Sequence, residues 1–127
     1  MSQETTDFFN SHSLNFLEMA LRHDHSERMA NPDGYGRRRG DCGDEVEFFL
    51  LGDSKKLETV SFFIQGCVHT TACCNTIACF AEGRSTEQAW QITPEKIADF
   101  LQTLPDDHFH CAELAAGAFY RALKDLS

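Results

Sequence analysis

Three cysteines lie at predicted boundaries between secondary-structure elements. Cys42 lies in the glycine-flanked turn GDCGDE, two residues before Asp44. Cys67 directly follows a glycine between a predicted strand and a predicted helix, and Cys111 follows His110 in the first turn of the last predicted helix. The N-terminus of a helix carries unpaired N–H groups and partial positive charge, which lower the pKa of a thiol. The positions of Cys67 and Cys111 therefore predict poised thiolates, which are soft metal ligands.

A buried structural cysteine is the commonest fate of a free thiol and is the alternative for each of these residues. Two of the three have a neighbour that could share their chemistry, Asp44 in one case and His110 in the other, which favours a common chemical role. Cys73, Cys74 and Cys79 fall inside a predicted helix of small residues. We expect these three to be core residues, with a spare or redox-sensitive thiol as the alternative.

Length and composition limit the classes of protein that the chain can belong to. The 127 residues are enough for one domain with a single core. A net charge of −9 argues against a nucleic acid or an anionic membrane as partner. The polar N-terminus lacks the features of a signal peptide, and no apolar run approaches the roughly 18 residues of a membrane span. We expect a cytoplasmic protein, in which six cysteines without a C-x-x-C pair are not a disulfide framework.

Hydrophobic periodicity predicts an N-terminal helix followed by a small sheet. A helix is expected over 7–22 and a turn over 31–36. Two strands over 44–51 and 57–64 are joined by the turn 52–56, so they are expected to pair antiparallel. A third short strand is compatible with the sequence but is not required by it.

Helices fill the rest of the chain. One is expected over 67–82, a second begins with the capping box at Ser85, and a third begins at Thr93 and ends before Pro105. The last begins near His110 and carries one apolar stripe: Cys111, Leu114, Ala115, Ala118, Phe119, Ala122 and Leu126. The order predicts an α+β fold, a small antiparallel sheet packed on one face by helices.

Four stretches of the sequence, in order, resemble one known family: CGDEVEFFLL, FFIQGCVHTTAC, FAEGRSTEQAW and LPDDHFHCAELAAGAFYRAL. They are similar to the iron–sulfur cluster assembly scaffolds of the NifU/IscU type. The resemblance runs from about Asn31 to Leu126, so it implies a NifU/IscU-like scaffold domain over 31–127 after an N-terminal helical segment over 1–30. It also supports the α+β fold and implies that the thiols meet at one end.

The resemblance extends to individual site residues. The three cluster cysteines of the family match Cys42, Cys67 and Cys111, its aspartate matches Asp44, and its histidine matches His110. The resemblance implies a non-enzymatic scaffold that holds a labile [2Fe–2S] cluster. A carboxylate oxygen binds such iron less firmly than a thiolate does, which favours release. Zinc could fill the same site in purified protein, with three cysteines and either the aspartate or the histidine as ligands.

The family also implies partners: a cysteine desulfurase, an iron donor and apo-proteins that receive the cluster. IscU-type members carry LPPVKLHC, whose first five residues an ATP-driven chaperone recognises, where this chain has LPDDHFHC. The acidic pair and His108 in place of lysine put that partnership in doubt. Two other functions use the same cysteines: a zinc-bound sulfur acceptor of the SufU type, weakened by the lack of the extra insertion, and a structural zinc domain that unfolds without metal.

Several other polar residues allow two interpretations. We expect His69 to be an exposed helix residue, and His23 and His25 to decorate a solvated helix end rather than bind metal. His108 either replaces the family's lysine near the site or lies on a loop. The basic run 37–39 either faces an anionic site or partner, or forms a solvated turn.

Overall fold

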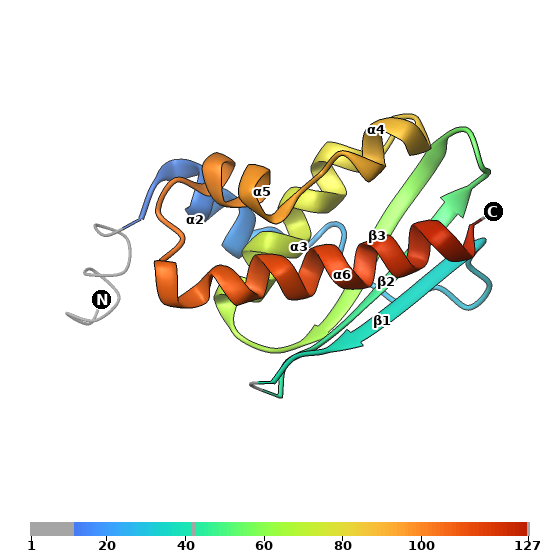
Figure 1. Cartoon of the computed structure of the whole chain (residues 1–127). Helices are drawn as coiled ribbons and strands as arrows, with labels where there is room; N and C mark the ends of the chain where they lie inside the picture. Colours follow the sequence, from blue (N-terminus) through green and yellow to red (C-terminus); the bar gives the residue numbers. More distant parts are fainter. Residues whose placement is uncertain (1–11, 42, 127) are drawn as a thin grey trace.

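A three-stranded antiparallel sheet carries the helices on one face in the computed structural model, which describes residues 12–41 and 43–126 (Figure 1). The strands are β1 (Gly34–Arg39), β2 (Glu45–Gly52) and β3 (Leu57–Gln65), paired in that order. The helices are α2 (Leu14–Leu21), α3 (Val68–Ala81), α4 (Thr86–Trp90), α5 (Pro94–Leu101), the 3-10 turn η1 (Asp106–His108) and α6 (Phe109–Asp125). The predicted α+β fold and the antiparallel pairing of β2 with β3 are confirmed.

Alternation along β2 places every second side chain against the helices. Val46, Phe48 and Leu50 are completely buried, and the register sets Phe48 opposite Phe62 of β3. The ring of Phe48 lies 5.9 Å from that of Phe62 and 5.3 Å from that of Phe119 in α6. Rings at these separations and tilts pack favourably, so the sheet and α6 share one aromatic core.

The third strand occupies residues that the sequence presents as a turn. β1 covers Gly34–Arg39, so the turn predicted over 31–36 is wrong from residue 34 onward, and 37–39 is strand rather than turn. The glycines serve close packing. A Cβ atom at Gly36 would lie 2.3 Å from the carbonyl oxygen of Ala118 in α6. Glycine within a strand often marks such an approach of another backbone.

Capping residues set where the helices begin and end. Ser13 is the N-cap of α2 and its Oγ accepts a hydrogen bond from the amide of Phe16, so the helix predicted over 7–22 begins later, with residues 7–11 outside the described residues. The capping box at Ser85 is confirmed. The third predicted helix ends at Leu101 rather than Leu104, because Gln102 adopts a positive φ of 65°.

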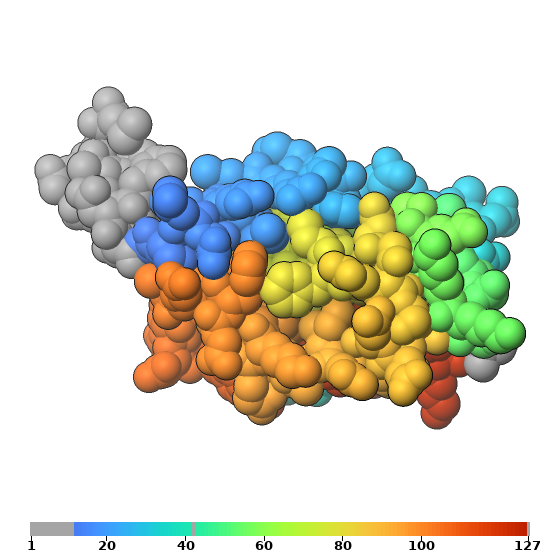
Figure 2. Space-filling view, turned by 90° about the horizontal axis from the view of Figure 1, so that it is seen from above, coloured from blue at the N-terminus to red at the C-terminus, as the bar shows by residue number. Residues whose placement is uncertain are grey.

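Helix α3 lies at the centre of the fold, in contact with α2, α5, α6 and β3. Its small residues allow this close packing, and Cys73 and Cys74 are completely buried, as expected, while Cys79 is half-buried. Figure 2 shows α2 and the segment after it (blue) beside α5 (orange), with part of α3 (yellow) between them. None of the helices in the described part of the chain is both long and apolar enough to cross a membrane.

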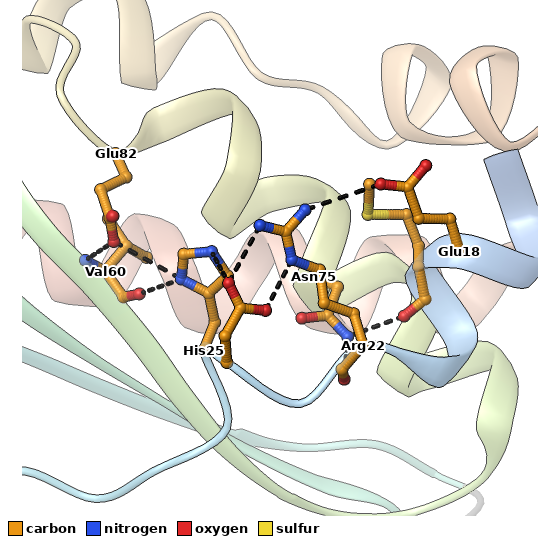
Figure 3. A network of polar contacts seen from close by, with 8 residues as sticks. Glu18, Arg22, His25, Val60, Asn75 and Glu82 are labelled. Carbon is orange, nitrogen blue, oxygen red and sulfur yellow. Dashed lines mark hydrogen bonds and ion pairs between the residues drawn. The ribbon is translucent and has the colours of Figure 1, made fainter.

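Polar contacts fix the segment that follows α2 (Figure 3). His25 is 9% exposed, and its Nδ1 lies 3.0 Å from the carbonyl oxygen of Val60 and 3.5 Å from a carboxylate oxygen of Glu82. The amide of Asn75 donates to the carbonyl oxygens of Met19 and Arg22. The prediction of a solvated helix end is therefore wrong for His25, although His23 is exposed. We call Arg22, Asp24, His25, Asn75 and Glu82 the His25 cluster.

Candidate metal centre

The first turns of α3 and α6 meet, and the two helices begin in the same way. Cys67 is the N-cap of α3, with His69 two residues and Thr70 three residues further on. His108 is the N-cap of α6, with His110 and then Cys111 at the equivalent positions. An N-cap side chain lies over the third residue of its helix, so this geometry pairs Cys67 with Thr70 and His108 with Cys111. Two helix N-termini, each with partial positive charge, face the same sulfur atoms.

Two thiols and one imidazole converge at this junction. Ligand atoms of Cys67, His108 and Cys111 all lie within 4.8 Å of one another. The Sγ of Cys111 is 3.8 Å from Nδ1 of His108 and 3.7 Å from Nε2 of His110. The Sγ of Cys67 is 3.7 Å from Nδ1 of His69. Cys42 lies outside the described residues, so its predicted place beside these two thiols stays a prediction.

The histidines form a row beside the thiols. The rings of His69 and His108 are stacked, with centroids 3.8 Å apart and planes inclined by 14°. The ring of His12 lies 6.2 Å beyond His69 and stacks on Phe16. Burial, followed by the neighbouring His108 and His12, lowers the pKa of His69. The expectation that His69 is an exposed helix residue is wrong, because the start of α6 packs against it.

Asp44 reaches the start of α3 from the loop before β2. Its Oδ2 accepts a 2.9 Å hydrogen bond from Oγ1 of Thr70, which is completely buried, and lies 3.5 Å from the amide nitrogen of Cys67. A Cβ atom at Gly66 would lie 2.8 Å from this carboxylate oxygen, so glycine leaves the space that Asp44 occupies. Asp44 thus lies beside Cys67, and its carboxylate is attached to the N-terminal turn of the helix that carries this thiol.

The environment of Cys111 does not lower its pKa. Burial, together with nearby Cys67 and Asp44, raises the pKa of the Cys111 thiol to about 11, although a hydrogen bond with Thr70 acts in the opposite direction. Cys111 is 1% exposed, so desolvation outweighs the partial positive charge of the helix N-terminus. The prediction of a poised thiolate is therefore wrong for Cys111 in the metal-free chain. A bound cation would supply the missing positive charge.

The spacing of these atoms suits a tetrahedral metal ion. With Zn–S bonds near 2.3 Å and Zn–N bonds near 2.0–2.1 Å, a sulfur and a nitrogen ligand of one tetrahedral zinc ion are about 3.5–3.6 Å apart. The contacts of Cys111 with His108 and His110, at 3.8 and 3.7 Å, and of Cys67 with His69, at 3.7 Å, are slightly longer than this. Thiolate and imidazole ligands suit zinc and iron–sulfur clusters.

A surface cavity of about 390 Å³ opens beside the junction, between the end of β1 and the start of α6. His110 lines it, with the two arginines Arg38 and Arg39 on the opposite side. Arg37 does not take part, since its guanidinium pairs with Glu45. Two of the three residues in the basic run therefore line a cavity that His110, Asp41 and Glu113 also line.

Three residues at this junction have a larger part than the sequence suggested. The sequence alone does not single out Thr70, although it lies three residues after an N-cap cysteine, and it favours an exposed position for His69. His108 and Cys111 have the i, i+3 spacing that brings side chains together at the start of a helix. That spacing could have favoured a place near the site over a place on a loop. The stack of His69 on His108 joins separate parts of the chain and has no local signal.

Comparison with known proteins identifies the family of the chain. The NifU-like N terminal domain family matches residues 27–127. The iron–sulfur cluster assembly scaffold protein IscU 1 of Archaeoglobus fulgidus is 32% identical over 84 residues, which are 66% of this chain and 55% of that protein. The IscU scaffold of Haemophilus influenzae is 32% identical over 85 residues, 66% of this chain and 67% of that protein. The chain thus spans about half the length of the Archaeoglobus relative.

Solved structures have the same fold. A putative iron–sulfur cluster assembly scaffold for the SUF system from Fervidobacterium islandicum has a TM-score of 0.75 and 19% identity, covering 87% of this chain and 95% of that one. The N-terminal part of a NifU-like protein from Brucella abortus also has a TM-score of 0.75, with 13% identity, covering 90% and 92%. With the family match over residues 27–127, the conclusion is direct: the chain belongs to the NifU-like N terminal domain family.

Proposed function

We propose that the chain is a scaffold on which a labile [2Fe–2S] cluster is assembled and from which it is passed to apo-proteins. The observation that carries this proposal is the convergence of Cys67, Cys111 and an imidazole where two helices begin. We expect Cys42, which is outside the described residues, to supply the third thiol. The cluster is cargo rather than a resident group, so the site must hold it and also release it.

The surroundings of the thiols suit the delivery of sulfur and iron. A thiolate of the site takes the terminal sulfur from a persulfide on a cysteine desulfurase, whose own cysteine leaves as a thiolate. The two helix N-termini favour anionic sulfur and an anionic cluster through their partial positive charge. An iron donor then provides the metal, and an electron donor reduces the transferred sulfur to the sulfide of the cluster. The protein acts in a reducing compartment, which we take to be the cytoplasm, because its thiols must stay free.

Asp44 gives the site its lability in this proposal. Its carboxylate lies beside Cys67 and offers a hard oxygen ligand that competes with the softer thiolates. Its negative charge also adds to the repulsion among the thiolates. Ligand exchange at this corner therefore allows the cluster to leave. We do not assign a chaperone that recognises the LPPVK sequence, because residues 104–108 read LPDDH.

A zinc-bound sulfur acceptor is the second candidate, and one observation favours it. The distance from Sγ of Cys111 to Nδ1 of His108, 3.8 Å, is close to the roughly 3.5–3.6 Å between a sulfur and a nitrogen ligand of a tetrahedral zinc ion. In that role the same cysteines would accept sulfur from a desulfurase while zinc stays bound. The distinction depends on whether iron and sulfide can occupy the site.

Anaerobic reconstitution with iron and sulfide tests the proposal. The parent protein should develop the visible charge-transfer bands of a [2Fe–2S] cluster and transfer the cluster to an apo-ferredoxin. Cys67→Ala and Cys111→Ala should abolish the bands, whereas Cys79→Ala, on the same helix but away from the site, should retain them. A parent protein that binds zinc tightly and acquires no bands would support the sulfur acceptor instead.

A further inference from the structure

We propose that His108 is the nitrogen ligand of this centre, held in position by its stack on His69; this inference rests on the proposed function. His108 lies within 4.8 Å of both thiols when one ligand atom is taken from each residue. The residue precedes α6 as its N-cap and approaches the sulfurs from that end. Thiolate and imidazole together make a ligand set that accepts zinc or an iron of a cluster.

His110 is the obvious competitor, and its geometry is less favourable. Its Nε2 is 3.7 Å from Cys111, which is as close as His108 comes. Among the described residues, however, the group of mutually close ligand atoms contains Cys67, His108 and Cys111, without His110. His110 is exposed and lines the outer cavity. A ligand must reach the metal that both thiols share, and this favours His108.

Asp44 is the other competitor, but protein groups already surround its carboxylate. Oδ2 accepts a 2.9 Å hydrogen bond from Thr70, whose side chain is completely buried. The same oxygen lies 3.5 Å from the amide of Cys67. To coordinate the metal with this oxygen, Asp44 would have to give up these contacts. Asp44 is therefore better suited to entering the coordination sphere during release than to holding the metal at rest.

The stack on His69 explains how an N-cap side chain can be held in position. The two rings are 3.8 Å apart and nearly parallel, so His69 limits rotation of the His108 ring. His69 is itself fixed in the first turn of α3 and lies 5.7 Å from the ring of the buried Phe16. His69 thus acts as a positioning residue. A fixed ring orientation sets which lone pair faces the metal, as outer contacts of metal-bound histidines commonly do.

The test uses the apo-protein of residues 1–127 loaded with zinc alone. Zinc affinity is measured by competition with a chromophoric chelator, and zinc K-edge X-ray absorption reports imidazole scattering. The variants are His108→Ala, His108→Cys, His110→Ala and His69→Ala, with His23→Ala as the control at an exposed histidine distant from the thiols. Circular dichroism of each apo-variant establishes that it is folded before metal is added.

His108→Ala should lose the imidazole scattering and bind zinc at least about 10-fold more weakly. His108→Cys should recover tight binding without imidazole scattering. His110→Ala and His23→Ala should keep the scattering, and His69→Ala should keep it with weaker binding. Persistence of imidazole scattering in His108→Ala, or its loss in His110→Ala, would overturn the inference. Failure of the proposed function is a different result, in which the parent protein forms no cluster with iron and sulfide.

Discussion

Two regions of this molecule gather histidine around a junction of elements, and they differ in what surrounds the rings. In the His25 cluster, the polar atoms contact protein donors and acceptors. Nδ1 of His25 lies 3.0 Å from the carbonyl oxygen of Val60, and the amide of Val60 donates a 3.0 Å hydrogen bond to the carboxylate of Glu82. At the metal centre, the ring of His108 meets a thiol at 3.8 Å and another imidazole.

The difference separates stability from ligand binding. Hydrogen bonds within the His25 cluster connect α2, β3 and the end of α3, so their loss should lower the free energy of unfolding. The metal centre collects sulfur and nitrogen atoms that make only long contacts with one another. Its side chains should therefore contribute little to apo-protein stability and much to metal affinity. Each region can be altered separately to test this division.

The largest expected effect on stability comes from Asn75→Ala. The buried amide donates to the carbonyl oxygens of Met19 and Arg22 at 2.7 and 3.1 Å. Its removal leaves two acceptors without this donor, which should cost about 2–4 kcal/mol of unfolding free energy. Urea unfolding measures the loss. Asn15→Ala, which removes one half-buried bond to Phe100, should cost about 1 kcal/mol.

Measuring the zinc affinity of Asn75→Ala tests whether the His25 cluster contributes to stability without contributing to metal binding. The folded Asn75→Ala protein should bind zinc as tightly as the parent, because Asn75 contacts the end of α2 rather than the thiols. A variant that kept its stability but lost zinc would contradict the division between the two regions.

Gly66→Ala should have the next largest effect and should affect both properties. The added Cβ would lie 2.8 Å from Oδ2 of Asp44, so the carboxylate must move away from Thr70. Overpacking of this kind costs about 1–3 kcal/mol. Thermal unfolding and zinc competition measure the two consequences. If the clash is the cause, Gly66→Ala should cost no further stability when Asp44 is already replaced by Gly; an equal additional loss in the double variant would place the cause elsewhere.

Asp44→Ala should destabilise the apo-protein by about 1 kcal/mol through loss of the bond from Thr70. It should also slow release and give a longer-lived cluster, because the hard oxygen and the negative charge are gone. Transfer to an apo-ferredoxin after anaerobic loading measures the rate. Asp44→Asn keeps an acceptor for Thr70 without the charge, so it should preserve stability and still slow release. Equal transfer rates in the parent and both variants would remove Asp44 from the release step.

The sequence predicted elements wherever the signal was local. The capping box at Ser85, the N-cap at Thr93 and the short turn that pairs β2 with β3 each depend on residues a few positions apart, and the structure has all three. The sequence allows a third strand but does not place β1, because its glycines reflect contact with α6: Gly36 packs against Ala118, 82 residues away in the chain. Glycine is common in turns and also where two backbones pack closely, so its presence alone does not distinguish the two.

The candidate site divides in the same way. The places of Cys67 and Cys111 at helix starts were predicted from neighbouring residues, and the structure has both there. The stack of His69 on His108 and the bond from Thr70 to Asp44 each join two distant segments. The raised pKa of Cys111 also depends on burial, which a helix position alone does not determine. The residue types therefore predict which side chains can bind a metal, but only the fold determines the burial and the neighbours of those side chains.

The smallest expected effect concerns the exposed edge of the His25 cluster. Arg22 donates to both carboxylate oxygens of Asp24, at 2.6 and 2.9 Å, and this bond is the main reason that the pKa of Asp24 falls from 3.8 to about 2. A lowered carboxyl pKa stabilises the folded state above the unfolded pKa. The contribution should therefore be present above pH 4 and be lost as the pH falls from about 4 to about 2.

Solvent limits the size of this contribution, because the side chain of Asp24 is 57% exposed and that of Arg22 is 34% exposed. We therefore expect Asp24→Asn to lower the free energy of unfolding by less than about 1 kcal/mol at neutral pH. Urea unfolding of both proteins at pH 6 and near pH 2 measures this, since other carboxyl groups cancel in the difference. The two proteins should converge in acid, and their zinc affinity at neutral pH should be equal. A difference that persists near pH 2 would mean that Asp24 acts through packing rather than charge.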